Sequence, residues 1–558
     1  MWFLIFCIFY KGTIVFTEQV NPILELEDGK LEGVLLTTDT GTNYYAFREI
    51  PYAKPPIGDL RFTEPVPSEK WSGIRDATKN TKICMQKVLF DIPASDPREN
   101  EDCLYINVFT PQVNAKYTEL LPIYVYFQGG MNVAGDLTEY NFQGFIDRNI
   151  IAVSMGFRQS SLGFLSTDDG VIPANLYLKD QILGLKWVQK NIKKFGGDPE
   201  KVTIGGHSSG ANAVGVLILS PKSSGLFRAA IMQSGTPLMR GRMLNATEAA
   251  YSFAETFEPK ARSMNTQQLL NYLRTLPAEK IARSDFKKRP DFVKAIFFGA
   301  IKEPWGYAVE NATFKNAAIV GPLHENFENG NFNHVPILIG ITNEELADYM
   351  YVYFAKDIDS RLDLLDVGIN IKPKNRRKAN LELKDMYTTT EKLADNATAI
   401  LQMAADVEFT IPIIQTAYLA SKFSDVYLYQ FSYKGPLNGL ETWRNNPVAN
   451  LTGIGNADHC SELPLLYYYR LNPKVTPTDE DLLMRRKMIN LWANFIKYTN
   501  PTPVKDPLFD EIIWPKTAKT DLKYVDISLQ MEIRCRPRRF FEWKEKIFKY
   551  FEYPKYIY

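Results

Sequence analysis

The sequence has little of what marks several specialised classes of protein. Its 558 residues include 4 histidines and 5 cysteines, and 65 lysines and arginines nearly balance 64 aspartates and glutamates. The resulting net charge of +1 gives no electrostatic basis for binding nucleic acid or an acidic polymer. No metal-ligand or nucleotide-binding motif stands out. We therefore expect a small, nearly neutral ligand, no nucleic-acid partner, and no cofactor or metal.

Long apolar runs are also scarce, and the one that opens the chain is short. The stretch "MWFLIFCIFYKGTIVFTEQ" has about the length of a signal-peptide core and is too short to span a bilayer comfortably. We expect a signal peptide over residues 1–17, with a tail buried in the fold as the alternative. We find no second stretch with the character of a membrane helix, and no hydrophobic tail of the kind that is exchanged for a lipid anchor. Sequons at Asn245, Asn311, Asn396 and Asn450 are compatible with a secreted glycoprotein.

The chain lacks repeats, low-complexity tracts and flexible linkers, which predicts a single domain over residues 18–558. A composition of 45% hydrophobic and 13% aromatic residues favours a substantial core. A hairpin is indicated around Asp28-Gly29, and a helical period covers 178–197. Apolar runs typical of buried strands occupy residues 121–127, 150–155, 201–206 and 335–341. Strands that alternate with helices predict an α/β fold with a large, mostly parallel central sheet flanked by helices. The oligomeric state is left open.

One short motif follows the third of these strands. Residues 206–210 read Gly-His-Ser-Ser-Gly, which matches G-x-S-x-G between a β-branched strand and a helical stretch. Small flanking residues keep the strained turn of a nucleophile free of clashes, and their spacing selects Ser208. Ser209 comes next, where its backbone N–H faces a developing oxyanion. Because neighbours in a sharp turn diverge, we expect His207 to face elsewhere.

A serine hydroxyl needs a base to become a nucleophile, and few histidines are available. The chain contains His207, His324, His334 and His459. Where such a motif carries a nucleophile at the end of a strand in an α/β sheet, the catalytic residues follow the order nucleophile, acid, histidine. Two acids, Glu344 and Glu345, stand just past the strand at 335–341, and only His459 follows them. The sequence therefore predicts Ser208, a glutamate at 344 or 345, and His459.

Longer motifs show a family resemblance over nearly the whole mature chain. "FREIPYAKPPIGDLRFTEPVP", "EDCLYINVFTP", "LKDQILGLKWVQKNIKKFGGDPEKVTIGGHSSG" and "HCSELPLLY" occur in this order. The chain resembles the type-B carboxylesterases of the cholinesterase–carboxylesterase family, and within it the insect secreted esterases. The resemblance implies an α/β-hydrolase fold with Ser208 as nucleophile, His459 as base and Glu345 as acid. It also implies a disulfide between Cys84 and Cys103.

The resemblance further implies a secreted serine carboxylic ester hydrolase that acts through an acyl-enzyme. The backbone N–H groups of Gly130, Met131 and Ser209 would form its oxyanion hole. Here the chain departs from the family, because Gln128-Gly129-Gly130-Met131 stands where His-Gly-Gly-Gly is usual, and Leu346 stands where glycine is common. These changes bear on rate and substrate range. They are also the best argument for the rival interpretation, a catalytically weak or inactive esterase-like binding or adhesion protein.

The loop between Cys84 and Cys103 bears on the substrate. Cholinesterases recognise a quaternary ammonium through a tryptophan in this loop, and here the loop contains none. The expected substrate is therefore an uncharged ester with an apolar acyl chain.

Two features outside these motifs carry weaker expectations. Cys460 is interpreted as a small hydrophobic residue rather than a reactive thiol. The sequence leaves open whether it pairs with Cys535. The basic, aromatic C-terminal tail is expected to dock on the fold as a last helix.

Overall fold

The computed structural model describes residues 21–86, 96–113, 120–239, 246–284, 305–346, 371–390, 396–438, 457–468 and 474–552. The predicted signal peptide and the sequons at Asn245 and Asn450 lie outside the described residues. The single domain over residues 18–558 stays a prediction.

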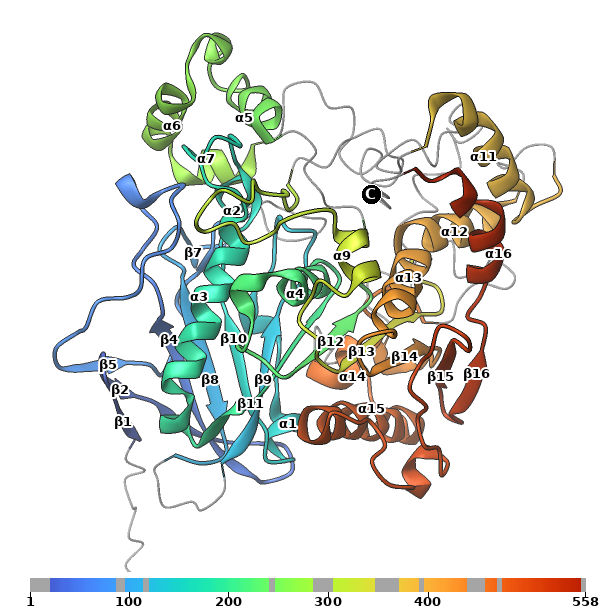
Figure 1. The fold of residues 1–558 in the computed structure, drawn as a ribbon. Helices are drawn as coiled ribbons and strands as arrows, with labels where there is room; N and C mark the ends of the chain where they lie inside the picture. Colours follow the sequence, from blue (N-terminus) through green and yellow to red (C-terminus); the bar gives the residue numbers. More distant parts are fainter. Residues whose placement is uncertain are drawn as a thin grey trace, which may run out of the picture.

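A mixed sheet of eleven described strands runs through the centre of the molecule, in the order β16-β15-β14-β13-β12-β11-β9-β10-β8-β4-β3 (Figure 1). Its parallel part comprises β9 (Leu121–Phe127), β10 (Ile151–Met155), β11 (Gly197–His207), β12 (Ala229–Gln233), β13 (Ile337–Thr342), β14 (Val426–Phe431) and β15 (Lys523–Ile527). Antiparallel strands form the edges, with β3 (Val34–Thr37), β4 (Asn43–Pro51) and β8 (Tyr105–Thr110) on one side and β16 (Glu532–Cys535) on the other. The predicted α/β fold with a mostly parallel sheet is confirmed.

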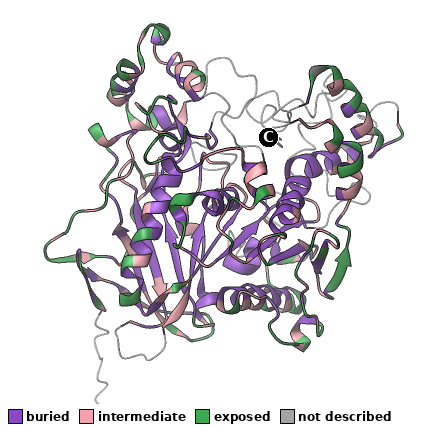
Figure 2. Ribbon diagram, in the orientation of Figure 1, coloured by how far each residue is buried: buried purple, intermediate pink, exposed green. Residues whose placement is uncertain are grey.

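Both faces of the parallel part of the sheet are buried, which explains why its strands read as largely apolar runs. In β9, Ile123 and Val125 point into one core while Tyr124 and Tyr126 point into the other. The first core is covered by α3 (Leu176–Asn191), α4 (Ser209–Leu219) and α13 (Ile411–Ala420), and the second by α1 (Gln143–Ile146), α14 (Leu463–Tyr467) and α15 (Asp479–Tyr498). Figure 2 shows these central elements as buried and most of the exposed residues on the periphery.

The two ends of the described chain form the elements that the sequence predicts, a hairpin near the N-terminus and a docked helix near the C-terminus. The hairpin around Asp28-Gly29 is formed by β1 (Ile23–Leu26) and β2 (Gly29–Glu32). Near the C-terminus, α16 (Phe540–Lys546) buries Phe540 and Trp543, and the indole N–H of Trp543 donates to the Tyr387 hydroxyl at 2.8 Å. None of the helices in the described ranges has the length and apolarity to cross a membrane.

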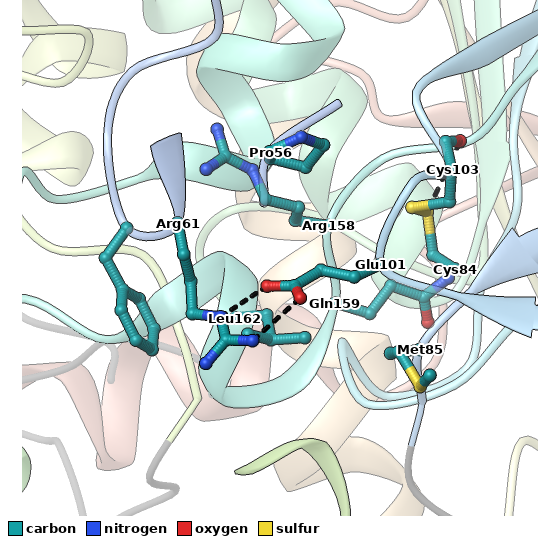
Figure 3. A pocket seen from close by; sticks show the side chains of 10 residues that line it. Pro56, Arg61, Cys84, Met85, Glu101, Cys103, Arg158, Gln159 and Leu162 are labelled. Atoms are coloured by element: carbon teal, nitrogen blue, oxygen red, sulfur yellow. Dashed lines mark hydrogen bonds and ion pairs between the residues drawn. A yellow bond between two sulfur atoms is a disulfide. The ribbon is translucent and has the colours of Figure 1, made fainter. Parts of the chain in front are cut away.

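Cys84 and Cys103 form the predicted disulfide, beside a small pocket shown in Figure 3. The pocket's volume of about 10 Å³ leaves room for about one water molecule, so no ester fits there. In this view the Arg61 guanidinium faces the Glu101 carboxylate, with N–O distances of 2.5 and 2.8 Å. Arg61 Nη1 also donates to three carbonyls at the end of α6 (Thr266–Thr275), those of Leu273, Arg274 and Leu276. Arg61 therefore ties the disulfide-bonded segment to α6.

A second buried ion pair, between Arg158 and Asp180, supports the same region. The two side chains are 4% and 0% exposed. Arg158 Nε and Nη2 donate to the Asp180 carboxylate at 2.8 and 2.6 Å.

Replacing Asp180 with asparagine removes one charge of this pair and leaves the charge of Arg158 buried. We therefore expect Asp180→Asn to lower the free energy of unfolding by about 3–5 kcal/mol, measured by urea denaturation. The exposed Lys54–Glu69 pair provides the control, because Glu69→Gln should change stability little. Equal losses in both variants would contradict this expectation.

Candidate active site

Ser208 occupies the tight turn between β11 and α4, at the carboxyl edge of the sheet. Its backbone angles are φ 55° and ψ −124°, a region that costs a non-glycine residue about 1–3 kcal/mol. The Ser208 N–H donates to the Gln233 carbonyl at 2.8 Å, and the Ser208 carbonyl accepts from the Asn212 N–H at 2.9 Å. These bonds hold the strained residue at the start of α4, as expected of a nucleophile in a strand–turn–helix motif.

The two glycines of the motif are required because the backbone approaches itself closely. A Cβ built on Gly206 would lie 2.5 Å from the carbonyl carbon of Gly210, and a Cβ on Gly210 would lie 2.3 Å from the Phe127 oxygen. Both distances are shorter than any real carbon contact, so a side chain at either position would push β9 and α4 apart. The spacing of G-x-S-x-G therefore has a steric cause in this fold.

Glu345 and His459 form a buried hydrogen-bonded pair just past the end of β13. His459 Nδ1 lies 2.7 Å from Glu345 Oε2, and the two residues are 8% and 0% exposed. The other carboxylate oxygen of Glu345 accepts from the Ser234 hydroxyl at 2.7 Å and from the Thr342 N–H at 2.8 Å. With both oxygens occupied, the carboxylate has a fixed orientation toward the imidazole.

The His459 segment is fastened to the strand that carries the acid. Glu344 and Asp458 form a parallel bridge, in which the Glu344 N–H donates to the Ala457 carbonyl at 2.9 Å. The Phe409 ring lies 4.8 Å from the His459 ring and packs on it. Among the described residues, the Ser208 hydroxyl makes no hydrogen bond to His459. Such bonds often tighten only when substrate is bound.

The loop after β9 lies directly against the Ser208 turn. A Cβ on Gly129 would stand 3.2 Å from the Ser208 Cβ. Gly130, Met131 and Asn132 all have positive φ, at 126°, 58° and 63°. This run of positive φ curls the chain so that the Gly130 carbonyl accepts hydrogen bonds from the N–H groups of Val133 and Ala134.

Three backbone N–H groups beside Ser208 donate to no acceptor within the part of the chain that the structure describes: those of Gly130, Met131 and Ser209. The following N–H, of Asn132, donates to the Ser209 hydroxyl at 3.3 Å and ties this loop to α4. Donors without a partner are available to a negatively charged oxygen. That they form an oxyanion hole stays a prediction.

The sequence also matches known proteins. The model of the Carboxylesterase family matches residues 20–542 of this chain. The chain belongs to the carboxylesterase family. It is 29% identical over 544 residues to the acylcarnitine hydrolase of Mus musculus, covering 92% of this chain and 88% of that protein. It is 30% identical over 543 residues to the juvenile hormone esterase of Tribolium castaneum, covering 91% and 88%. It is 29% identical over 559 residues to venom carboxylesterase-6 of Apis mellifera, covering 95% of both chains. The predicted family and its carboxylic ester hydrolase activity are confirmed.

His207 of this carboxylesterase does not face away from the site. Its ring lies 4.5 Å from the His459 ring, and the Cys460 sulfur lies 3.9 Å from its Nδ1. The prediction that His207 faces elsewhere is therefore wrong, because a segment distant in the sequence docks over the end of β11 and covers this side chain. Burial, and then the neighbouring His459, hold the pKa of His207 well below its usual range, so the ring is neutral.

The two cysteines left unassigned by the sequence both keep their thiols. Cys460 is partly buried and packs against the second core, while Cys535 is exposed on β16. A Cys460–Cys535 disulfide is absent from the described structure.

Glu462 is a second buried carboxyl group in this region. Burial, and then the charge of Glu345, raise the pKa of Glu462 to about 8. Near pH 7 the Glu462 side chain is therefore mostly protonated and adds little negative charge beside Glu345. Gln233 Nε2 lies 3.4 Å from one of its oxygens.

Sequence reasoning missed the supporting residues Ser234 and Glu462. Ser234 follows β12 directly, so the rule that ligands gather at the carboxyl ends of parallel strands could have found it. Glu462 stands as a single acid within the run "SELPLLY", which is otherwise largely apolar. An acid in such a run signals burial.

Proposed function

We propose that this carboxylesterase cleaves carboxylic esters through an acyl-enzyme formed on Ser208. The observation that carries the proposal is the 2.7 Å hydrogen bond between His459 Nδ1 and Glu345 Oε2. When Nδ1–H donates to the carboxylate, Nε2 keeps the lone pair that can accept a proton. This hydrogen bond supports Glu345, rather than Glu344, as the acid.

In the proposed reaction Ser208 Oγ attacks the ester carbonyl carbon and its proton passes to His459 Nε2. The imidazolium, stabilised by Glu345, gives this proton to the departing alcohol as the ester C–O bond breaks. Water, deprotonated by His459, then attacks the acyl-serine, and the acid and the Ser208 hydroxyl are released. The N–H groups of Gly130, Met131 and Ser209 hold the oxyanion in both steps, and each is worth roughly 3–4 kcal/mol of transition-state stabilisation.

An active-site phosphonate tests the nucleophile directly. A fluorophosphonate probe should phosphonylate Ser208 with loss of fluoride, and mass spectrometry of the peptide that spans the motif should locate the label. Ser209→Ala should still be labelled, since the neighbouring hydroxyl is not the nucleophile, whereas Ser208→Ala should not. A wild-type protein that stays unlabelled at long exposure would instead support the rival, an inactive binding protein with the esterase fold.

The substrates proposed are uncharged esters with an apolar acyl chain. The absence of tryptophan between Cys84 and Cys103 removes the usual cation–π partner of a quaternary ammonium in this family. The Phe409 ring against His459 and the Met131 side chain add apolar surface beside the site. Relatives are named for different esters, acylcarnitine in one case and juvenile hormone in another. The preference for the alcohol part of the ester therefore needs a direct test.

A matched pair of thioesters provides that test. Butyrylthiocholine and its carbon isostere, S-(3,3-dimethylbutyl) thiobutyrate, differ only in that a neutral carbon replaces the positively charged nitrogen. Because a cation–π contact is worth up to about 2 kcal/mol, a cholinesterase-like site would prefer the cation by roughly tenfold or more. We expect the uncharged isostere to have an equal or higher kcat/KM, measured by thiol release. A tenfold preference for butyrylthiocholine would contradict the proposal.

We also propose that the protein is secreted and glycosylated. Venom carboxylesterase-6, by its name, occurs in a secretion. Among the described sequons, Asn311 is the more accessible, because its residue is exposed and its side-chain oxygen accepts from the Thr313 N–H and hydroxyl. The amide of Asn396 is partly buried, and its oxygen caps a helix.

A further inference from the structure

We propose that His207, His459 and Cys460 form a binding site for a thiophilic divalent cation such as Zn²⁺. One ring nitrogen of each histidine and the Cys460 sulfur lie within 4.8 Å of one another. Tetrahedral Zn²⁺, with bonds of about 2.3 Å to sulfur and about 2.0–2.1 Å to nitrogen, requires its ligand atoms to be roughly 3.3–3.6 Å apart. The 3.9 Å between Cys460 Sγ and His207 Nδ1 is close to this value. To reach this geometry, no two of the three ligand atoms need to approach each other by more than about 1.5 Å.

The surroundings of the histidines favour a metal independently of these distances. His207 is 2% exposed, so its ring, whose Nδ1 faces the Cys460 sulfur, is held in place by the surrounding residues. His459 is already oriented by Glu345 through Nδ1, and this carboxylate–histidine arrangement is typical of metal ligands.

The chemistry of the three groups selects the kind of ion. Two imidazoles and a thiol suit Zn²⁺, Cd²⁺ or Co²⁺, whereas Mg²⁺ and Ca²⁺ prefer oxygen ligands. On binding, the Cys460 thiol releases its proton to solvent and a sulfur–metal bond forms, without any change in oxidation state. A fourth position stays open to water or another exchangeable ligand.

The consequence for activity rests on the proposed function of His459. A metal ion on His459 would occupy the lone pair that accepts the Ser208 proton, so the bound cation would inhibit ester hydrolysis. A chelator would reverse the inhibition, because no covalent bond within the protein changes.

Binding is tested without any assay of activity. Titration of the purified enzyme with Co²⁺ should produce a thiolate-to-cobalt charge-transfer band in the near ultraviolet. Cys460→Ser should lose the band, and Cys535→Ser, which removes the exposed thiol on β16, should keep it. Absence of the band in the wild-type enzyme, or its persistence in Cys460→Ser, would overturn the proposal.

Inhibition is tested with Zn²⁺ and an uncharged ester, each variant being compared with its own metal-free rate. Removing one of three ligands in Cys460→Ser should raise the half-inhibiting Zn²⁺ concentration at least tenfold, on the order of the loss seen when metal sites are weakened. His334→Gln, which removes an exposed histidine, should leave that concentration unchanged. If Cys460→Ser is as sensitive as the wild-type enzyme, the proposal fails. If the enzyme proves inactive, the cobalt band still decides whether the metal site exists, so failure of the proposed function is separable from failure of this inference.

Discussion

Replacing Ser208 with alanine is expected to lower kcat/KM for p-nitrophenyl butyrate by about 10⁶-fold. In the proposed reaction this hydroxyl supplies the atom that bonds to the acyl group, and no other described hydroxyl occupies its place in the strained turn after β11. Some rate above that in water should remain, because the three unengaged N–H groups still polarise the ester carbonyl. Initial rates at substrate concentrations well below KM would give kcat/KM directly.

The fold should survive this substitution, which makes the result interpretable. Alanine has the same backbone restriction as serine at φ 55°, so the strain of the turn is unchanged. Ser209→Ala is the matched control: it removes an adjacent hydroxyl that accepts one hydrogen bond from Asn132 but keeps the Ser209 N–H. We expect a loss of no more than about tenfold from this variant, in keeping with one neutral hydrogen bond. Comparable losses in the two variants would show that the turn, rather than the Ser208 hydroxyl, had been disturbed.

Glu345→Gln is expected to lower kcat by about 10⁴-fold with a smaller effect on KM. Both oxygens of Glu345 accept hydrogen bonds, from His459 on one side and from Ser234 and Thr342 on the other. A glutamine must turn its NH₂ toward one of these sides. Facing His459, it favours the tautomer with the proton on Nε2, which can no longer accept the proton of Ser208.

The neighbouring acid provides the control for this variant. Glu344 contributes its backbone N–H to the bridge with the His459 segment, and Glu344→Gln leaves that N–H in place. We expect its kcat to stay within about threefold of the wild-type value, since partly exposed charges contribute little. The idea that Glu345 is the acid would be abandoned if Glu344→Gln proved to be the more damaging change.

Much of the framework could be predicted because it depends on local patterns. The apolar runs at 121–127 and 335–341 correspond to β9 and β13, since strands buried on both faces need continuous apolar sequence. The helix predicted over 178–197 is α3 followed by a single-turn 3-10 helix, Ile192–Phe195, and it ends at Gly196 with φ 81°. The antiparallel strands were not predicted: β3 and β16 have only four residues each, and β4 mixes exposed and buried positions.

Contacts across the site could not be predicted in the same way. Glu345 was chosen over Glu344 by family resemblance, and its hydrogen bond to His459 depends on how a distant segment docks past β13. The contact of His207 with His459 was missed for the same reason, because adjacency to Ser208 in the sequence says nothing about a neighbour from another part of the chain. The protonated state of Glu462 depends on burial that one acid among apolar residues only suggests.

The order of strands in the sheet has an evolutionary consequence. Ser208, Ser234 and Glu345 follow β11, β12 and β13, which are neighbours in the sheet although the chain between them is long. Their separation is therefore set by the spacing of adjacent strands, about 4.8 Å each, and not by the length of the connecting segments. Insertions and exchanges in those segments can change the surface around these three side chains while the side chains themselves keep their places. The fold can therefore keep these side chains together while the segments around them change.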